Sequence, residues 1–204
     1  MTDAAATWIC PVCDKAAPAR SERCSHCQAR LLLDGRYAVE RFLGSGGQGR
    51  TYAGRDLSNG RAVAIKELSL ARARDPKAIA LFRRSAEVLA SLDHPGIPAF
   101  HGFFDVERDG VSFYYLVQEL VDGENLAKAL ERGERFDEAS VKAIVRQALE
   151  VLAYLHGLPD PVIHRDVKPT NLMRRRDGRI VLIDFDLVRR QARNDGSMTL
   201  SVGT

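Results

Sequence analysis

The sequence predicts an α+β protein, in which an antiparallel sheet with one helix is followed by a partly helical region and preceded by a small metal-binding module. Three observations predict this fold class. Residues 35–121 read mainly as strands around one helix, and the pattern becomes helical from about residue 122 onward. All four cysteines lie between residues 10 and 27. A chain of 204 residues suffices for one medium domain and a small module.

The composition excludes several classes of protein. With 45% hydrophobic and 28% charged residues, the chain is typical of soluble globular proteins. A net charge of +3 does not favour nucleic acid or an anionic membrane as the main partner. No apolar stretch approaches the ~18 residues of a membrane-spanning helix, and "MTDAAATWIC" lacks the features of a secretory signal. We therefore expect a cytoplasmic protein without a membrane segment.

Strands are expected at "RYAVERFLG", "GRTYAGRD" and "GRAVAIKELS", because alternating apolar residues there are separated by Gly and Asn-Gly turn signals. The stretch 75–92 predicts a helix, capped by Asp75 and with one apolar stripe. The stripe consists of Ile79, Phe82, Ala86 and Leu89. "HPGIP" ends this helix, and "VSFYYLVQEL" follows as another strand.

A long helix is expected over about 138–156. Its buried side should carry Val141, Ile144, Val145, Ala148, Leu152 and Leu155. "NLMRRRDGRIVLID" then has the pattern of a hairpin, with Asp177-Gly178 as a two-residue turn. The arginines of this hairpin are interpreted as a solvated turn.

The cysteines form two CxxC pairs, Cys10/Cys13 and Cys24/Cys27, with ten residues between the pairs. This spacing predicts a structural Zn²⁺ site of four thiolates, closed to further ligands. Two disulfides are an alternative that a reducing cytoplasm disfavours, and a redox pair does not explain the duplication. His26 could replace one cysteine but is expected to be exposed. Residues 1–33 therefore read as a zinc ribbon, which could dock a protein partner.

Polar residues suited to phosphate chemistry recur along the rest of the chain. "GSGGQG", residues 44–49, is followed by a strand, so it predicts a glycine hairpin whose backbone N–H groups can approach phosphates. Lys66 ends the "VAIK" strand. "VIHRDVKPTN" carries Asp166 as a candidate proton acceptor, Lys168 as a cation for phosphate and Asn171 as a magnesium ligand. Asp184 follows the hairpin as a second magnesium ligand.

The order of these motifs resembles the signature set of protein kinases. The chain from about residue 34 to 204 is similar to a bacterial-type serine/threonine protein kinase domain. This resemblance implies an N-lobe over about 35–121 and a partial, helical C-lobe over about 122–204. Lys168 within "HRDVKPTN" favours Ser/Thr over Tyr specificity, so the implied substrate is a protein hydroxyl of Ser or Thr.

The resemblance also implies residue roles. The glycine hairpin would cover ATP with Gly44, Ser45, Gly46, Gly47, Gln48 and Gly49. Lys66 would hold the α/β-phosphates, the backbone of Glu119 and Val121 would meet adenine, and the adenine slot would be lined by Val63, Ala64 and Met173. Asp166 would be the catalytic base and Lys168 a γ-phosphate contact. Asn171 and Asp184 would bind Mg²⁺, with Mn²⁺ as an alternative.

Two residues depart from the family pattern near Lys66. Asp186 stands where the D-F-G motif has glycine, and we expect it to strain the backbone, to take no part in the work of Asp184 and to impair activity. The family places a glutamate that pairs with the lysine at the position of Ser85. Glu87 lies ~160° around the helix from Ser85, so Lys66 is expected to lack its carboxylate partner.

The end of the chain is the third departure. "SMTLSVGT" resembles an activation segment, with candidate phosphoacceptors Ser197, Thr199, Ser201 and Thr204. We expect a truncation within this segment, with exposed apolar surface on helix 138–156 as a consequence. The alternative function is therefore a pseudokinase or a zinc-ribbon interaction module. Nucleic-acid binding is a weaker interpretation, which rests on Trp8, Arg20, Arg23 and Arg30 alone.

Overall fold

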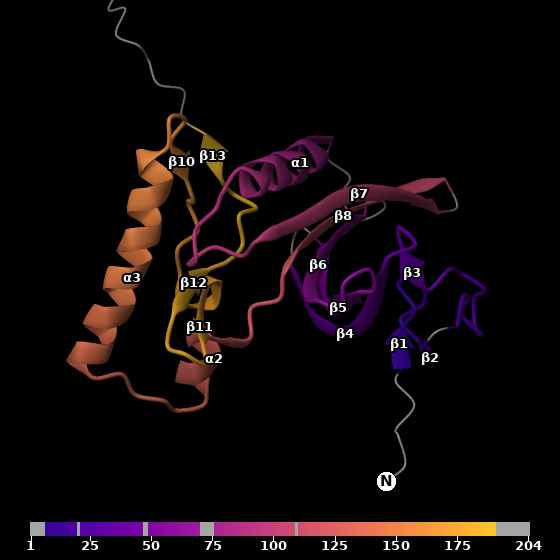
Figure 1. Ribbon diagram of the computed structural model, residues 1–204, viewed down its shortest axis with the longest axis horizontal. Helices are drawn as coiled ribbons and strands as arrows, with labels where there is room; N and C mark the ends of the chain where they lie inside the picture. Colours follow the sequence, from indigo (N-terminus) through magenta and orange to yellow (C-terminus); the bar gives the residue numbers. More distant parts are fainter. Residues whose placement is uncertain (1–6, 20, 47–48, 70–75, 109, 191–204) are drawn as a thin grey trace, which may run out of the picture.

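The computed structural model describes residues 7–19, 21–46, 49–69, 76–108 and 110–190. Its largest element is a six-stranded antiparallel sheet of order β3-β4-β5-β6-β8-β7 (Figure 1). The strands are β3 (Leu32–Leu33), β4 (Tyr37–Gly46), β5 (Gly49–Asp56), β6 (Ala62–Ser69), β7 (Phe100–Arg108) and β8 (Val111–Glu119). This is the antiparallel N-lobe sheet that the sequence predicts.

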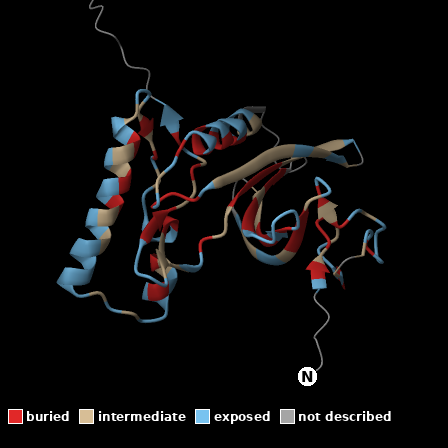
Figure 2. Ribbon diagram, in the orientation of Figure 1, coloured by how far each residue is buried: buried red, intermediate tan, exposed pale blue. Residues whose placement is uncertain are grey.

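One helix, α1 (Pro76–Ala90), packs against this sheet and contacts β7. Phe82, Ala86 and Leu89 of the predicted stripe are buried, and the same core cluster contains residues of the C-lobe. Figure 2 shows buried residues along the inner side of α1 and through the strands beneath it. The helix therefore connects the two lobes through one apolar core. Asp75, the predicted cap, lies outside the described residues.

The C-lobe begins with β9 (Gly123–Asn125) and α2 (Leu126–Glu131), followed by α3 (Glu138–Gly157). Asn125 and Asp137 cap these helices, because their side chains accept the backbone N–H of Lys128 and Ser140. The remaining elements are β10 (Val162–Ile163), a 3₁₀ turn (Pro169–Asn171), β11 (Leu172–Arg175), β12 (Ile180–Leu182) and β13 (Arg189–Arg190). β9, β11 and β12 form a second antiparallel sheet, which confirms the fold class.

The hairpin β11–β12 confirms the predicted pairing but not the predicted turn. Arg175 N donates to Arg179 O (2.8 Å), so three residues form the loop instead of two. Gly178 ends this loop with a φ of 83°, a left-handed conformation that glycine adopts without cost.

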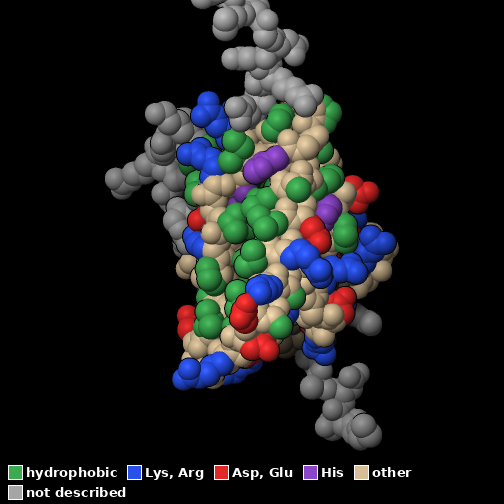
Figure 3. Space-filling model, turned by 90° about the vertical axis from the view of Figure 1, so that its left-hand side faces the viewer, with side chains coloured by type: hydrophobic (Ala, Val, Ile, Leu, Met, Phe, Trp, Pro, Cys, Tyr) green, Lys and Arg blue, Asp and Glu red, His purple; other side chains and the backbone are tan. Residues whose placement is uncertain are grey.

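Helix α3 buries only part of the predicted stripe. Ala148, Val151 and Leu155 are buried, whereas Val141 and Val145 are exposed, and Leu149 is exposed as well. The prediction of a buried side is therefore wrong for the first two valines, because no described element covers the first half of α3 on that face. The expectation of exposed apolar surface is confirmed, and Figure 3 shows hydrophobic side chains gathered on this face. No helix among the described residues is both long and apolar enough to cross a membrane.

The cysteine module contains β1 (Thr7–Ile9) paired with β2 (Ala16–Pro18). Its core includes Trp8, Cys10 and Cys24, and it extends to Leu31 and to Ala38 of β4. The module therefore packs directly on the edge of the N-lobe sheet. Because Trp8 is buried, it offers no aromatic face to nucleic acid.

Candidate active site

The glycine hairpin lies between β4 and β5, where Gly44 pairs with Thr51 and Gly46 with Gly49. Gly49 has a φ of 149°, and a Cβ at this position would lie 1.8 Å from Glu67 O on β6. Only glycine therefore allows the hairpin to approach the strand that carries Lys66. Ser45 belongs to this hairpin, whereas Gly47 and Gln48 lie outside the described residues.

The predicted adenine side is built around β6 and the end of β8. Ala64 and Lys66 lie two residues apart on β6, so they share one face of the sheet. Ala64 pairs with Gln118, which is buried. At the end of β8, Glu119 N donates to Ala99 O (2.8 Å), so this N–H is already engaged. Val121, two residues further on, is buried.

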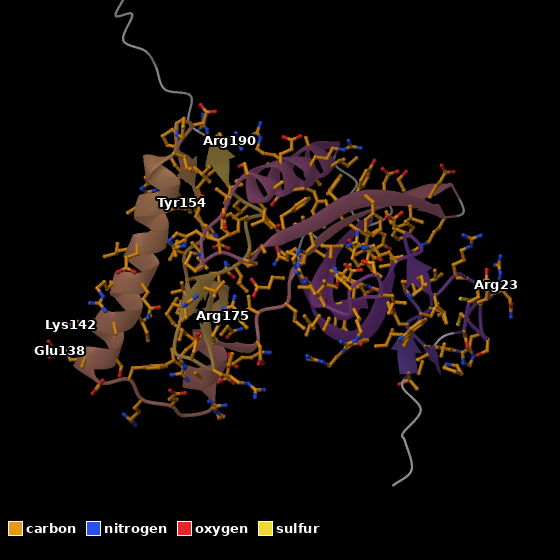
Figure 4. The ribbon with its side chains drawn as sticks, in the orientation of Figure 1. Arg23, Glu138, Lys142, Tyr154, Arg175 and Arg190 are labelled. Carbon is orange, nitrogen blue, oxygen red and sulfur yellow. The ribbon has the colours of Figure 1, made fainter. Side chains whose placement is uncertain are left out.

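The end of β8 at Glu119, here called the hinge, is tied to the C-lobe by an ion pair. Arg175 Nη2 lies 2.6 Å from Glu119 Oε1, and Arg175 is labelled in Figure 4. Arg175 ends β11, the strand that also carries Met173. Met173 pairs with Asn125 and Val181, so this predicted adenine contact is a strand residue of the C-lobe, next to the hinge ion pair.

Two residues of the "HRDVKPTN" segment, Lys168 and Asn171, converge on the carboxylate of Asp166. Asn171 Nδ2 donates to Asp166 Oδ2 (2.9 Å) and to Asp166 O (2.9 Å). Lys168 Nζ lies 2.8 Å from the same Asp166 Oδ2. This neighbour raises the pKa of Lys168, so the ammonium stays charged. The arrangement holds a carboxylate, a cation and an amide oxygen within one short loop.

This loop is fixed to the segment that carries Asp184. His164 is buried, its Nε2 lies 3.2 Å from Ile183 O, and its ring packs edge-on against Phe185 at 4.9 Å. Burial lowers the pKa of His164, which keeps the imidazole neutral. Ile183 N in turn donates to Asn171 O (2.8 Å). The two predicted magnesium ligands are thereby held in neighbouring segments.

Lys66 has two carboxylate partners. Its Nζ lies 2.7 Å from Asp184 Oδ1 and 3.1 Å from Asp186 Oδ1. The Lys66 and Asp186 side chains are only 13% and 16% exposed. The expectation that Lys66 lacks a carboxylate in place of the helix glutamate is therefore wrong, because Asp186 contacts it together with Asp184. The sequence signal that could have revealed this is the loss of one carboxylate at 85 and the gain of one at 186. That Asp186 takes no part in binding magnesium stays a prediction.

The backbone at Asp186 carries no left-handed strain. Among the described residues, the non-glycine residues with positive φ include Arg165 (69°) and Asp184 (69°), but not Asp186. The left-handed strain expected from replacing glycine is therefore absent at this position.

Helix α1 reaches the same cluster through Ser85. Ser85 is fully buried, and its Oγ donates to Phe185 O (2.7 Å) and lies 3.4 Å from Asp186 Oδ1. Glu87 is exposed, which confirms the prediction that it lies on another face of the helix.

The charges of this cluster are strongly coupled. Burial opposes the charge on Lys66, but Asp186 and Asp184 outweigh it and raise the pKa of the ammonium. Burial raises the pKa of Asp186 to about 6. Burial opposes the charge on Asp184, but the attraction of Lys66 and the hydrogen bonds with Lys66 and Asp186 together outweigh it and lower the pKa of this carboxyl. The cluster therefore holds one firmly charged carboxylate and one that is easier to protonate.

The four cysteines form a second site. They are free thiols, and their sulfur atoms all lie within 4.8 Å of one another. Cys10 and Cys27 sulfurs are 3.5 Å apart and those of Cys13 and Cys24 are 3.6 Å apart, close to the ~3.8 Å expected when four sulfurs surround Zn²⁺ at ~2.3 Å. Backbone N–H groups lower the pKa of Cys24 to about 7, whereas burial raises the pKa of Cys10 to about 12, so the fit to a metal rests on the distances between the sulfur atoms. The residues therefore fit a zinc ion.

The cysteine module contacts the N-lobe beside the glycine hairpin. Asp14, next to Cys13, accepts two hydrogen bonds from Arg50 Nη1 (3.0 and 2.8 Å), and Arg50 directly follows Gly49. Arg108 donates from Nη1 to Pro11 O (3.1 Å) and from Nη2 to the hydroxyl of Tyr115 (2.6 Å). The module is thus joined to the sheet by polar contacts as well as by its core.

Three features together define a protein-kinase-like fold. They are the antiparallel sheet with its glycine hairpin, the lysine that contacts two carboxylates, and the loop in which Lys168 and Asn171 contact Asp166. The chain belongs to the protein kinase domain family, whose model matches residues 37–204.

Several of the curated relatives are, by name, bacterial serine/threonine-protein kinases. The chain is 38% identical over 169 residues to a probable serine/threonine-protein kinase of Streptomyces coelicolor, covering 83% of this chain and 24% of the relative. It is 36% identical to serine/threonine-protein kinase B and 35% identical to serine/threonine-protein kinase F of Synechocystis. Each of these alignments covers 85% of this chain, and they cover 30% and 39% of the two relatives. The chain thus spans less than half of each relative.

Proposed function

We propose that this chain binds Mg·ATP and transfers the γ-phosphate to a Ser or Thr hydroxyl of a protein substrate. The observation that carries this proposal is the convergence of Lys168 and Asn171 on Asp166, beside a segment in which Asp184 contacts Lys66. The relatives named as serine/threonine kinases support the same reaction.

In this proposal Asp166 acts on the substrate hydroxyl. Its carboxylate accepts the hydroxyl proton while the oxygen attacks the γ-phosphorus, and the bond to ADP breaks so that ADP leaves with the electron pair. Lys168 offsets the charge of the transferring group, and its hydrogen bond to Asp166 keeps it beside that carboxylate. Asn171 orients Asp166 through its two hydrogen bonds. Positioning and charge neutralisation account for the chemistry.

The nucleotide is held by residues of both lobes. Lys66 would contact the α/β-phosphates, and the glycine hairpin with Ser45 would cover them. The carbonyl of Glu119 and the N–H of Val121 are the candidate adenine contacts, with Ala64 and Met173 against the ring. Asn171 and Asp184 would hold Mg²⁺ or Mn²⁺, which when bound neutralises phosphate charge.

We also propose that residues 1–33 form a structural zinc ribbon ahead of a kinase domain over 34–204. Cys10, Cys13, Cys24 and Cys27 would bind Zn²⁺, and the closed set of four thiolates leaves no position for catalysis. A protein partner of the ribbon remains part of this proposal. Metal analysis of the purified chain tests it: one zinc per chain is expected, and none after Cys13→Ser and Cys24→Ser are combined.

Thermal unfolding with and without Mg·ATP tests the kinase proposal. A ligand that binds only the folded chain stabilises it by about 2.7 kcal/mol at 100 times its dissociation constant. We expect a magnesium-dependent rise in the unfolding temperature. Asp184→Asn should abolish this rise, whereas Asp105→Asn, an exposed carboxylate on β7, should keep it. A clear transition without any nucleotide effect would contradict ATP binding.

A further inference from the structure

The Lys66 cluster combines two departures from the kinase pattern that meet in space. Ser85 on α1 and Asp186 after Phe185 are 101 positions apart in sequence, yet Ser85 Oγ lies 3.4 Å from Asp186 Oδ1. That same carboxylate oxygen lies 3.1 Å from Lys66 Nζ. One carboxylate oxygen is therefore situated between the helix and the lysine.

We propose that Asp186 is the positioning residue for Lys66, in place of the helix glutamate, and that Ser85 is the matching small residue that makes room for it. The proposal rests on the proposed function, because positioning Lys66 matters for catalysis only if the chain binds ATP.

The charge around the lysine supports this exchange. A lysine paired with a helix glutamate and a metal-binding aspartate has two carboxylates near it. Here Asp184 and Asp186 also provide two, so Ser85 and Asp186 together leave the local charge unchanged. Lys66 is therefore held as an ammonium between two carboxylates although its helix partner is missing.

Space makes the two residues interdependent. Ser85 is completely buried, and its hydroxyl already reaches Phe185 O. A glutamate at 85 would extend two carbons further, toward the position that the Asp186 carboxylate occupies. Two carboxylates would then share one small buried space, where like charges disfavour each other. Glutamate at 85 therefore fits with glycine at 186, and serine at 85 fits with aspartate at 186.

The replacement of the helix glutamate by Asp186 also changes which element fixes the orientation of Lys66. Both partners of Lys66 belong to the segment 184–186, whereas α1 contributes a hydrogen bond to the backbone of that segment. The orientation of Lys66 is thus fixed by the segment 184–186 itself, and among the described residues Ser85 makes the polar contact of α1 with this segment.

A double-mutant cycle on the 204-residue chain tests this proposal. Affinity for Mg·ATP is measured by calorimetry for Asp186→Gly, Ser85→Glu and the double variant. Loss of a charged hydrogen-bond partner should weaken binding about 10- to 100-fold in Asp186→Gly. Ser85→Glu alone should also bind weakly, whereas Ser85→Glu/Asp186→Gly should return to near the wild-type affinity. Glu87→Gln, an exposed carboxylate on the same helix, serves as the control and should change nothing.

A second measurement needs no nucleotide. The acetylation rate of Lys66 by N-hydroxysuccinimidyl acetate is followed by mass spectrometry in the same variants. A paired ammonium reacts slowly, so Asp186→Gly should speed the modification and the double variant should slow it again. Circular dichroism shows which variants are folded. If Asp186→Gly does not fold, Asp186→Asn, which keeps the shape of the side chain, replaces it with the same expected single-variant effects.

The outcomes separate this inference from the proposed function. If the wild-type chain does not bind Mg·ATP, the proposed function fails, and the acetylation rates alone decide whether Asp186 positions Lys66. If the wild-type chain binds Mg·ATP but the Asp186 variant matches it in both measurements, the inference is overturned. A double variant no better than Asp186→Gly would also overturn it, because the two residues would then act independently.

Discussion

The cluster around Asp166 and the cluster around Lys66 each hold a lysine against carboxylate, but they differ in which sequence positions supply the groups. In the first, each motif residue is present, and Lys168 and Asn171 both contact Asp166. In the second, the expected helix carboxylate is missing, yet Lys66 contacts two carboxylates. The comparison teaches that a motif position and the chemical group it provides are separable: a carboxylate can come from another element if the neighbouring residue leaves space.

This difference bears on the pseudokinase alternative. That hypothesis rested on Ser85, Asp186 and the end of the chain. The first two are now one arrangement that keeps the number of carboxylates near Lys66, so they no longer count as two separate defects. No comparison with known proteins supports the alternative either. The candidate phosphoacceptors Ser197, Thr199, Ser201 and Thr204 lie outside the described residues, as does Arg20.

The largest effect is expected at the Asp166 cluster. Asp166→Asn removes the proton acceptor but keeps the shape of the side chain, so kcat for phosphate transfer to a protein substrate such as casein should fall about 10²- to 10⁴-fold. Affinity for Mg·ATP should stay the same. Radiolabel transfer and calorimetry measure the two quantities. Transfer that persists at the wild-type rate would mean that Asp166 is not the base.

The two clusters can be distinguished more directly by comparing how much the free energy of unfolding falls when Lys66 or Lys168 is replaced. Lys66→Met leaves two partly buried carboxylates without their cation, which should lower the free energy of unfolding by about 3 kcal/mol. Lys168 is 51% exposed, so Lys168→Met should cost only about 0–1 kcal/mol. Urea unfolding at pH 7 measures both. Equal losses would show that the Lys66 cluster is no more tightly coupled than a surface ion pair.

The smallest effect is the pH dependence of that loss. Without Lys66, burial and mutual repulsion hold the folded-state pKa values of Asp184 and Asp186 above the unfolded value of about 3.9. The folded state then binds more protons than the unfolded state, so stability rises as pH falls through this range. The loss in free energy of unfolding that Lys66→Met causes should therefore be largest at pH 8 and smaller at pH 5. A loss that is constant between these values would contradict this account.

Much of the fold follows from local sequence patterns. The strands β4, β5, β6 and β8 and helix α1 could be predicted because alternation, glycine turns and a 3.6-residue stripe are local signals. The loop from Asp166 to Asn171 could be predicted because its residues lie within six positions. The spacing of the cysteines likewise identified four thiols that lie within 4.8 Å of one another.

The errors arise where distant segments decide the outcome. The contact of Asp186 with Lys66 spans 120 positions, and no local pattern reports which carboxylate fills a space left by a serine. The exposure of Val141 and Val145 depends on what packs against α3, which the period of the helix does not contain. The need for glycine at Gly49 depends on the backbone of β6.

The Ser85–Asp186 exchange constrains how such a chain could have been inherited. A change from glutamate and glycine to serine and aspartate passes through one of two intermediates. One crowds three carboxylates around Lys66, and the other leaves Asp184 as its only carboxylate partner. Because both intermediates are expected to bind nucleotide less well than either end point, the two residues should be gained and lost together. A descendant that altered only one of them would face selection to alter the other.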